Sequence, residues 1–205
     1  MTLTPPSSVF VGVSGASGAP YALRVVRALS DAGCELQLCV SDSGVLVLRH
    51  ELRFAGEGRE PVMREFLELA GAAGRVEVYT PDDLAAPPAS GSSCPDAVVV
   101  CPCSMSTAAH VALGATRTLI HRVADVALKE RRSLVLVPRE TPLTQIHLRR
   151  LLELAEAGAV VLPAMPGFYS RPETLQDAVD HVAGKVLSAL GFEQALFPPW
   201  DGGRR

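Results

Sequence analysis

Four groups of side chains follow apolar runs in this sequence and have residue types that can bind a phosphate or another polar ligand. They are Ser14–Gly18, Ser41, Cys103–Thr107 and Arg139–Glu140. Hydroxyl groups and small-residue loops can hold a phosphate, and a charged pair at a strand end can bind a polar ligand. Because ligands of parallel α/β sheets bind at the carboxyl ends of the strands, we expect one site to collect all four groups.

The first group lies in the stretch Phe10–Leu29. Its apolar start predicts a buried strand, the small residues of Ser14–Ala19 predict a tight loop, and Pro20 stands where a helix would begin. A strand, a tight loop and a helix N-terminus together predict an anion site. The G-x-x-G spacing is neither the dinucleotide fingerprint nor a P-loop, so a mononucleotide is the favoured ligand. An ordinary turn between strand and helix is the alternative.

Three hydroxyl side chains, Ser104, Ser106 and Thr107, stand together at an expected helix start. One of them suffices to cap the helix, which leaves the others for a phosphate or a polar ring edge. Further along, Arg122 lies a helical step from apolar neighbours, and this position favours an inward side chain over a solvated basic face.

Arg139 and Glu140 directly follow an apolar run and are bracketed by prolines. Prolines restrict the backbone and suit a rigid presentation of both side chains, although a surface ion pair of little energy is the alternative. Tyr169 follows a loop rich in Pro and Gly, where helix packing does not explain an aromatic residue. Trp200 lies in a proline-containing tail and can pack on its own domain or on a neighbour's ligand.

The composition bounds the class of protein. The chain has 205 residues, of which 48% are hydrophobic and 20% charged, so we expect one folded domain over residues 1–205. No apolar run reaches the roughly 20 residues of a membrane span, and the N-terminus lacks the pattern of a secretory signal. The formal net charge of -3 argues against nucleic acid. We therefore expect a cytoplasmic protein that binds neither membrane nor nucleic acid.

The cysteines and histidines do not predict a metal centre. The five cysteines are an odd number, and Cys101-Pro102-Cys103, even with Cys94 and His110, lacks the paired C-x-x-C spacing of structural zinc sites. The histidines are scattered, and none stands beside a Ser or Cys with a carboxylate, so a Ser-His-Asp triad has no motif behind it. We expect no metal.

Strands alternate with helices along the chain, which predicts an α/β fold with a doubly wound, Rossmann- or flavodoxin-like parallel sheet and helices on both faces. We expect Val45, Leu46 and Leu48 on the buried side of their helix, an irregular stretch over Pro81–Ser93, and an irregular tail over residues 191–205. The first expected strand begins at Phe10, and five further strands are expected over residues 35–40, 76–79, 97–100, 134–137 and 159–162. Expected helices cover 20–29, 42–52, 62–70, 104–113, 119–129, 143–154 and 175–190.

Over nearly its whole length the chain resembles the flavin prenyltransferases of the UbiX group. The matching stretches are GASGA (15–19), ASGS (89–92), PCSM (102–105), RVADVALKERRSLVLVPRETPL (122–143) and AGAVVLPAMPGFYSRPETLQDAVDHVAGKVL (157–187). The resemblance implies a metal-independent transfer of a dimethylallyl group from dimethylallyl phosphate to N5 and C6 of reduced FMN. It also implies a homo-oligomer, a dodecamer in this group, with sites at subunit boundaries and a decarboxylase that receives the prenylated FMN.

The resemblance assigns roles to individual residues. The implied FMN-binding residues are Gly15, Ala16, Ser17, Ser41, Ser104, Met105, Ser106, Thr107 and Arg122. The implied donor-binding residues are Ser90, Gly91, Lys129, Arg139, Glu140, Tyr169, Lys185 and Trp200, of which Trp200 would reach a neighbouring subunit with the tail. The implied catalytic residues are Ser17, Glu51, Lys129, Arg139 and Glu140.

The sequence departs from the group's pattern at two positions. Ser106 stands where CSMKT would place a lysine, and Lys185 stands where many members have an arginine, which supplies charge without a bidentate fork. Two other functions remain open, a flavin-dependent decarboxylase of a cysteinyl substrate and a non-catalytic carrier of prenylated FMN. A pure carrier would not need a second phosphate site made of Lys129, Arg139, Glu140 and Tyr169. The pathway stays open between ubiquinone biosynthesis and breakdown of aromatic acids.

Overall fold

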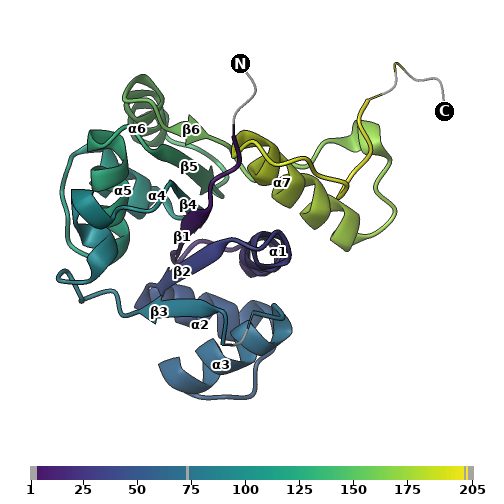
Figure 1. The fold of residues 1–205 in the computed structure, drawn as a ribbon. Coiled ribbons are helices and arrows are strands. Elements are labelled where there is room, and N and C mark those ends of the chain that lie inside the picture. Colours follow the sequence, from purple (N-terminus) through teal and green to yellow (C-terminus); the bar gives the residue numbers. More distant parts are fainter. Residues whose placement is uncertain (1–3, 73, 201, 203–205) are drawn as a thin grey trace.

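Six parallel strands form one sheet in the order β3-β2-β1-β4-β5-β6 (Figure 1). The computed structural model describes residues 4–72, 74–200 and 202. The strands are β1 (Ser8–Val13), β2 (Glu35–Val40), β3 (Val76–Tyr79), β4 (Ala97–Cys103), β5 (Ser133–Pro138) and β6 (Val160–Val161). This is the strand order of the Rossmann fold, and the direction of winding reverses between β1 and β4, where such folds bind ligands. The predicted fold class is confirmed.

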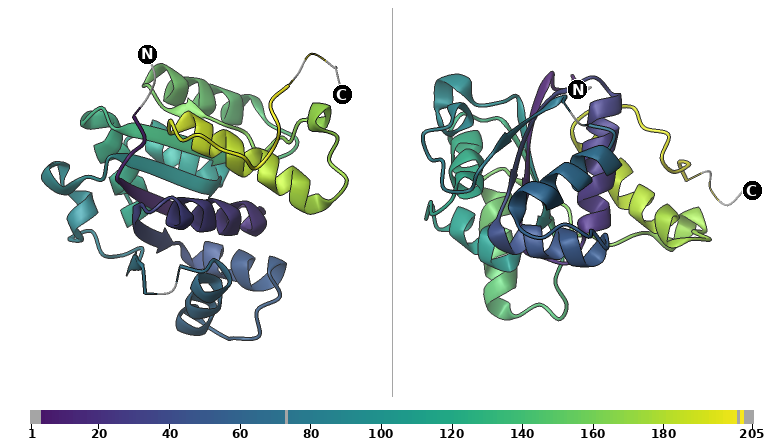
Figure 2. Two further views of the ribbon diagram at one scale, coloured as in Figure 1. Left: turned by 45° about the vertical axis from the view of Figure 1, so that its right-hand side comes forward. Right: turned by 90° about the horizontal axis from the view of Figure 1, so that it is seen from below.

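Helices cover both faces of the sheet (Figures 1 and 2). One face carries α1 (Ala19–Asp31), α2 (Asp42–Glu51), α3 (Arg59–Leu69) and α7 (Leu175–Ala189). The other face carries α4 (Met105–Ala112), α5 (Leu119–Lys129) and α6 (Gln145–Glu156). Three short 3₁₀ helices, η1 (Pro87–Ala89), η2 (Gly91–Ser93) and η3 (Phe168–Ser170), lie in the connections.

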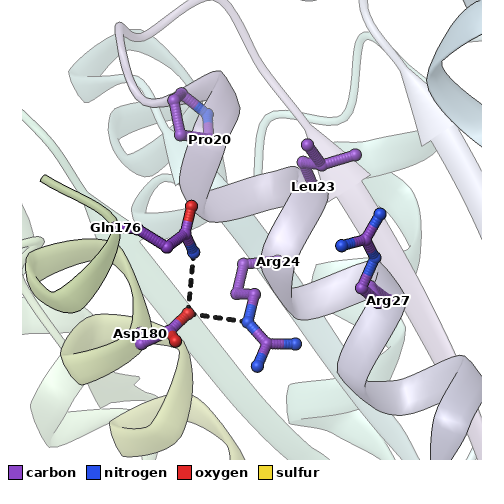
Figure 3. Close-up of a pocket in the computed structure, with 6 residues that line it drawn as sticks. All are labelled: Pro20, Leu23, Arg24, Arg27, Gln176 and Asp180. Atoms are coloured by element: carbon purple, nitrogen blue, oxygen red, sulfur yellow. Dashed lines mark hydrogen bonds and ion pairs between the residues drawn. The ribbon is translucent and has the colours of Figure 1, made fainter. Parts of the chain in front are cut away.

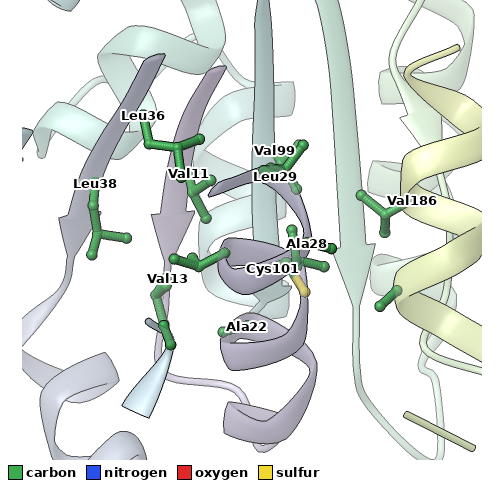
Figure 4. Close-up of a cluster of buried hydrophobic side chains, with 14 of the residues drawn as sticks. Val11, Val13, Ala22, Ala28, Leu29, Leu36, Leu38, Val99, Cys101 and Val186 are labelled. Carbon is green, nitrogen blue, oxygen red and sulfur yellow. The ribbon is translucent and has the colours of Figure 1, made fainter. Parts of the chain in front are cut away.

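Burial on both faces explains the unbroken apolar runs of the central strands. Val9, Val11 and Val99 pack under α1 and α7, whereas Phe10 and Val98 pack under the helices of the opposite face. Figure 4 shows this first cluster, with α1 in front of the central strands and α7 beside it. A parallel sheet requires such double cover, which fixes the loops at its carboxyl ends relative to one another.

Several predicted elements need correction. The Pro81–Ser93 stretch is not wholly irregular, because it contains η1 and η2. Leu46 is 67% exposed although Val45 and Leu48 are buried, since consecutive helical residues point about 100° apart. Helix α6 begins at Gln145, two residues later than expected, and two of its four leucines, Leu148 and Leu152, are exposed, whereas Leu154 is buried and Leu151 packs partly against the core.

Cys101 and Cys103 lie in opposite hydrophobic clusters although they are two residues apart. A register shift between Val100 and Cys103 breaks the alternation of the strand and turns the two side chains to different faces. Burial raises the pKa of both thiols, that of Cys103 to about 12.

Over residues 4–72, 74–200 and 202, no three His, Cys, Asp or Glu side chains form a metal-binding group. Within the same ranges no helix is long and apolar enough to cross a membrane.

Candidate functional site

The loop after β1 is tied to the start of α4 by one buried side chain. The Ser14 hydroxyl donates to the carbonyl oxygen of Pro102 at 2.9 Å and accepts from the Ser104 N–H at 2.7 Å. The Ser14 N–H donates to the same Pro102 oxygen at 3.2 Å. Ser14 therefore joins the carboxyl ends of β1 and β4, and its hydroxyl is already engaged in the protein.

The hydroxyls at the start of α4 have different environments. Ser104 Oγ accepts from the Thr107 N–H at 3.2 Å and donates to Thr107 Oγ1 at 3.0 Å, which caps the helix. Met105 and Thr107 are buried, whereas Ser106 is exposed. Of the three predicted hydroxyls, Ser106 is therefore the one that faces solvent, and its carbonyl oxygen lies 2.8 Å from His110 Nδ1.

The β1 loop also meets the start of α2. Ser41 caps this helix by accepting from the Gly44 N–H at 3.0 Å, and its hydroxyl lies 3.2 Å from Ser43 Oγ. A Cβ on Gly15 would lie 2.6 Å from the Ser43 Cβ, so only glycine allows this approach. Gly15, Ser41 and Ser43 therefore gather at one edge, and Ser43 is a neighbour that the sequence did not indicate.

Glu51 occupies the N-terminus of α1. Its Oε2 accepts from the N–H groups of Gly18 at 2.9 Å and Ala19 at 2.8 Å. A carboxylate of the chain therefore takes two N–H groups at this helix start, and the binding of a phosphate by the loop stays a prediction. Burial raises the pKa of Glu51, but hydrogen bonds from the Ser17 side chain and from both N–H groups, with the charge of Arg139, hold it below its usual value.

Arg139 reaches the same place from the end of β5. Its Nε donates to the carbonyl oxygen of Ser17 at 2.9 Å. Ser17, Glu51 and Arg139 thus border one cavity of about 320 Å³. The complete lining is Ser17, Gly18, Pro20, Tyr21, Glu51, Arg139, Ala164, Leu175, Ala178 and Val179. A cation, a carboxylate and a hydroxyl face an apolar wall here, an arrangement that can hold the polar edge of a ring and move a proton.

Tyr21 is a lining residue that the sequence analysis missed. Burial raises the pKa of its phenol, the nearby Cys101 raises it further, and the charge of Arg139 acts in the opposite direction. The sequence could have indicated Tyr21, because this residue directly follows Pro20 and must therefore lie in the first turn of the predicted helix.

Helix α7 forms the far wall of this cavity and is fixed to α1 by a polar contact. Arg24 Nε donates to Asp180 Oδ1 at 2.7 Å, and Gln176 Nε2 donates to the same oxygen at 2.8 Å (Figure 3). These side chains border a surface groove of about 480 Å³ between the two helices. The contact holds the N-terminal turns of α7 against α1, where Leu175 and Val179 reach the cavity.

Glu140 and Arg139 diverge although they are adjacent. Arg139 turns towards Ser17, whereas Glu140 is exposed and its Oε1 accepts from the Thr141 N–H at 3.1 Å. The surface ion pair considered as an alternative is therefore not what these residues form.

A second group of predicted residues lies along α5. The Lys129 ammonium pairs with Glu130 at 2.7 Å, and a Cβ on Gly91 would lie 3.1 Å from Lys129 Nζ. Arg122 Nε donates to the Ala89 carbonyl oxygen at 3.1 Å, next to Ser90. The structure thus brings Ser90, Gly91 and Lys129 together, and their binding of the prenyl donor stays a prediction.

This second group is separated from the cavity in a single chain. Lys129 ends α5 shortly before β5 begins at Ser133, whereas Arg139 follows the end of β5. The six residues of this strand span about 20 Å. Within one chain, Ser90, Gly91 and Lys129 therefore lie away from the cavity, and their place in a site shared between subunits stays a prediction.

A third group lies on η3, α7 and the tail. Tyr169 Oη lies 3.0 Å from His181 Nε2, and the ring of Trp200 lies edge-on to Tyr169 with centroids 6.1 Å apart. Lys185 stands one helical turn beyond His181. Among the described residues, none of this group lines the cavity bordered by Ser17. Trp200 is exposed and packs on its own chain, and its reach to a neighbour stays a prediction. Residues 201 and 203–205 of the tail lie outside the described residues.

Comparison with known proteins gives one consistent result. The profile of the Flavoprotein family matches residues 2–188. The chain is 47% identical over 197 residues to the flavin prenyltransferase UbiX of Pseudomonas aeruginosa, an alignment that covers 95% of this chain and 94% of that protein.

Two solved structures are similar over almost the whole chain. One is AnUbiX (PadA1) in complex with FMN and dimethylallyl pyrophosphate, with a TM-score of 0.85, 36% identity and coverage of 96% of this chain and 98% of that one. The other is a dodecameric FMN-dependent UbiX-like decarboxylase from Escherichia coli O157:H7, with a TM-score of 0.82, 38% identity and coverage of 95% and 99%. With a family profile over most of its length and relatives aligned nearly end to end, this chain belongs to the Flavoprotein family and, within it, to the UbiX group of flavin prenyltransferases.

Proposed function

We propose that this flavin prenyltransferase transfers a dimethylallyl group from dimethylallyl phosphate to N5 and C6 of reduced FMN, without a metal ion. The observation that carries the proposal is the cavity at which Ser17, Glu51 and Arg139 meet. It combines a cation for a leaving phosphate with a hydroxyl and a carboxylate for proton transfer, beside apolar side chains that exclude water.

The residues at the carboxyl ends of β1, β2 and β4 suit FMN. The close approach of Gly15 to Ser43 leaves a small-residue loop whose backbone a phosphate can reach, and the hydroxyls of Ser41 and Ser106 lie at the same sheet edge. Ala16, Ser104, Met105 and Thr107 would support this binding mainly through the backbone, because their side chains are buried or engaged in capping.

Bound reduced FMN would supply the nucleophilic N5 and C6 atoms. Ser17 and Glu51 would hold the ring edge and its proton, because the pKa of Glu51 lies below its usual value and keeps it ionised, able to accept from Ser17. Arg139 would stabilise the departing phosphate, and Glu140, the next residue in the chain, would exchange a proton with a phosphate oxygen.

We further propose that the complete site needs more than one copy of the chain. Lys129 with Ser90 and Gly91, and Tyr169 with Lys185 and Trp200, would reach the cavity from neighbouring copies, because one chain holds them apart. Exposed apolar side chains support such contacts: Leu175, at the cavity, is 88% exposed, and the other large ones include Ile146, Leu148, Leu152, Phe168 and Trp200. The dodecameric E. coli structure supports a dodecamer for this chain.

The test is a direct assay. Purified protein is incubated under reducing conditions with FMN and either dimethylallyl phosphate or the diphosphate, with and without EDTA, and the flavin is analysed by mass spectrometry. We expect prenylated FMN from the monophosphate, unaffected by EDTA. Failure to form it with either donor would contradict the proposal, and release of carbon dioxide from a cysteinyl peptide would favour a decarboxylase instead. Activation of a prenylated-FMN-dependent decarboxylase by the product would identify the proposed recipient.

A further inference from the structure

His181 is a buried histidine on α7 that no role described so far uses. It is 5% exposed, and its ring stacks at a tilt on Phe197 with centroids 4.5 Å apart. Both ring nitrogens are engaged: Nδ1 accepts from the Gly167 N–H at 3.3 Å, and Nε2 lies 3.0 Å from Tyr169 Oη. The side chain therefore joins α7 to the loop that carries Tyr169.

The backbone contact fixes which nitrogen carries the proton. A backbone N–H can only donate, so Nδ1 must present its lone pair to Gly167. A neutral imidazole has one proton, which then lies on Nε2 and is donated to Tyr169 Oη. Because Tyr169 Oη accepts this hydrogen bond, the phenolic proton remains free to be donated to a different acceptor.

The surroundings of His181 keep the ring neutral. Burial lowers its pKa, and the positive charge of Lys185 one turn along the helix lowers it further. If Nδ1 were protonated, its N–H would also point at the N–H of Gly167, and the two donors would repel each other. Tyr169 is 45% exposed, so its hydroxyl is accessible to a ligand or a neighbouring copy.

We infer that His181 is a positioning residue for the prenyl donor: its Nε2–H orients Tyr169 so that the phenolic O–H points outward and donates to a phosphate oxygen. Lys185 supplies the charge beside this donor. The inference rests on the proposed function, since it takes Tyr169 to belong to the donor-phosphate site. The chemistry recognised is a phosphate ester, which accepts hydrogen bonds and gives none when fully ionised.

Two amide substitutions separate the two contacts of His181. In His181→Asn the amide oxygen takes the place of Nδ1 and keeps the bond to Gly167, but the side chain is too short to reach Tyr169. In His181→Gln the amide nitrogen takes the place of Nε2 and keeps a donor for Tyr169. Each is made in the natural chain and in Tyr169→Phe, and exposed His50→Asn on α2 is the matched control.

Steady-state kinetics with saturating reduced FMN and varied dimethylallyl phosphate give the readout, together with the FMN dissociation constant and melting temperature. We expect His181→Asn to raise the donor KM about tenfold, the effect of one well-oriented hydrogen bond to a charged group. FMN affinity should not change, and His181→Gln should stay within about threefold of the natural chain. In the Tyr169→Phe background His181→Asn should have no additional effect on KM.

Other outcomes overturn the inference. Equal KM values for the Asn and Gln variants, or a His181→Asn effect that persists in Tyr169→Phe, would reduce His181 to a structural link. If His181→Asn does not fold, a strongly raised donor KM in the His181→Gln enzyme would equally overturn the positioning role. If Tyr169→Phe has the same donor KM as the unmodified protein, Tyr169 does not belong to the donor site. His181 then has no positioning role there either. A natural chain that makes no prenylated FMN would instead refute the proposed function.

Discussion

Arg139 Nε donates a hydrogen bond of 2.9 Å to the main-chain carbonyl oxygen of Ser17, a residue 122 positions earlier in the chain. This bond connects the end of β5 to the loop after β1 and sets a cation beside Glu51. The geometry makes the loop and the guanidinium depend on each other, so changes at either end should affect both FMN and the prenyl donor.

Ser17→Leu should abolish FMN binding. The larger side chain would fill the cavity that Ser17 shares with Glu51 and Arg139, and it removes the hydroxyl. Absorbance of the purified protein and titration with FMN measure the outcome, and Ser43→Ala is a milder control in the neighbouring helix. A variant that purifies with full FMN occupancy would show that the flavin lies elsewhere.

Glu51→Gln should reduce the loss of folding stability that occurs as the pH falls. The pKa of Glu51 is held below its ordinary value of 4.5 in the folded protein, so the unfolded chain binds more protons below that pH. Its stabilising contribution is therefore present above pH 4.5 and is lost as the pH falls through the folded pKa. Urea unfolding from pH 6 to pH 3 should show a smaller pH dependence in Glu51→Gln, and an unchanged slope would contradict the assignment.

Glu140→Gln should retain FMN and lose turnover. Glutamine preserves size and hydrogen bonding but cannot carry a proton, so product formation should fall about 10²-fold or more, as for other general acid–base groups. Arg139→Ala should chiefly weaken the donor phosphate and, through the lost bond to Ser17, lower FMN affinity as well. If Glu140→Gln turns over as fast as the unmodified protein at saturating donor, Glu140 takes no part in the chemical step.

Mixed oligomers should recover activity from two inactive variants. Lys129→Ala and Arg139→Ala each remove one cation, and the two cations lie at opposite ends of β5. If a site combines them from different copies, random equal mixing leaves about a quarter of the sites with both. Activity after refolding the variants together, with oligomeric size measured by light scattering, tests this. No recovery, or an active monomer, would contradict sites shared between copies.

Gly167→Ala should displace Tyr169. A Cβ at this position would lie 2.7 Å from Tyr169 Cε1 and 3.2 Å from His181 Nε2, so the tyrosine ring has to move. We expect a higher KM for dimethylallyl phosphate and little change in FMN affinity, measured on the same preparation. Gly158→Ala has open space around its Cβ and strains only its own backbone, where φ is 101°, so it controls for a general loss of stability.

The order of elements and the strand ends that carry chemistry were accessible from the sequence. The buried strands read as apolar runs because a parallel sheet hides both faces, and Arg139 stands out because it follows such a run directly. The match of local stretches such as Gly15–Ala19 to the UbiX group supplied the reaction, which no spacing argument could provide.

Which residues meet was decided by the tertiary structure. Glu51 takes the α1 N-terminus because α2 packs beside α1 in three dimensions, and no local pattern encodes that distance. The sequence assigned no role to His181, and only the fold of the 163–170 loop over α7 brings it to Tyr169. Lys129 and Arg139 are close in sequence and far apart in space, because the extended strand β5 between them places them at its opposite ends.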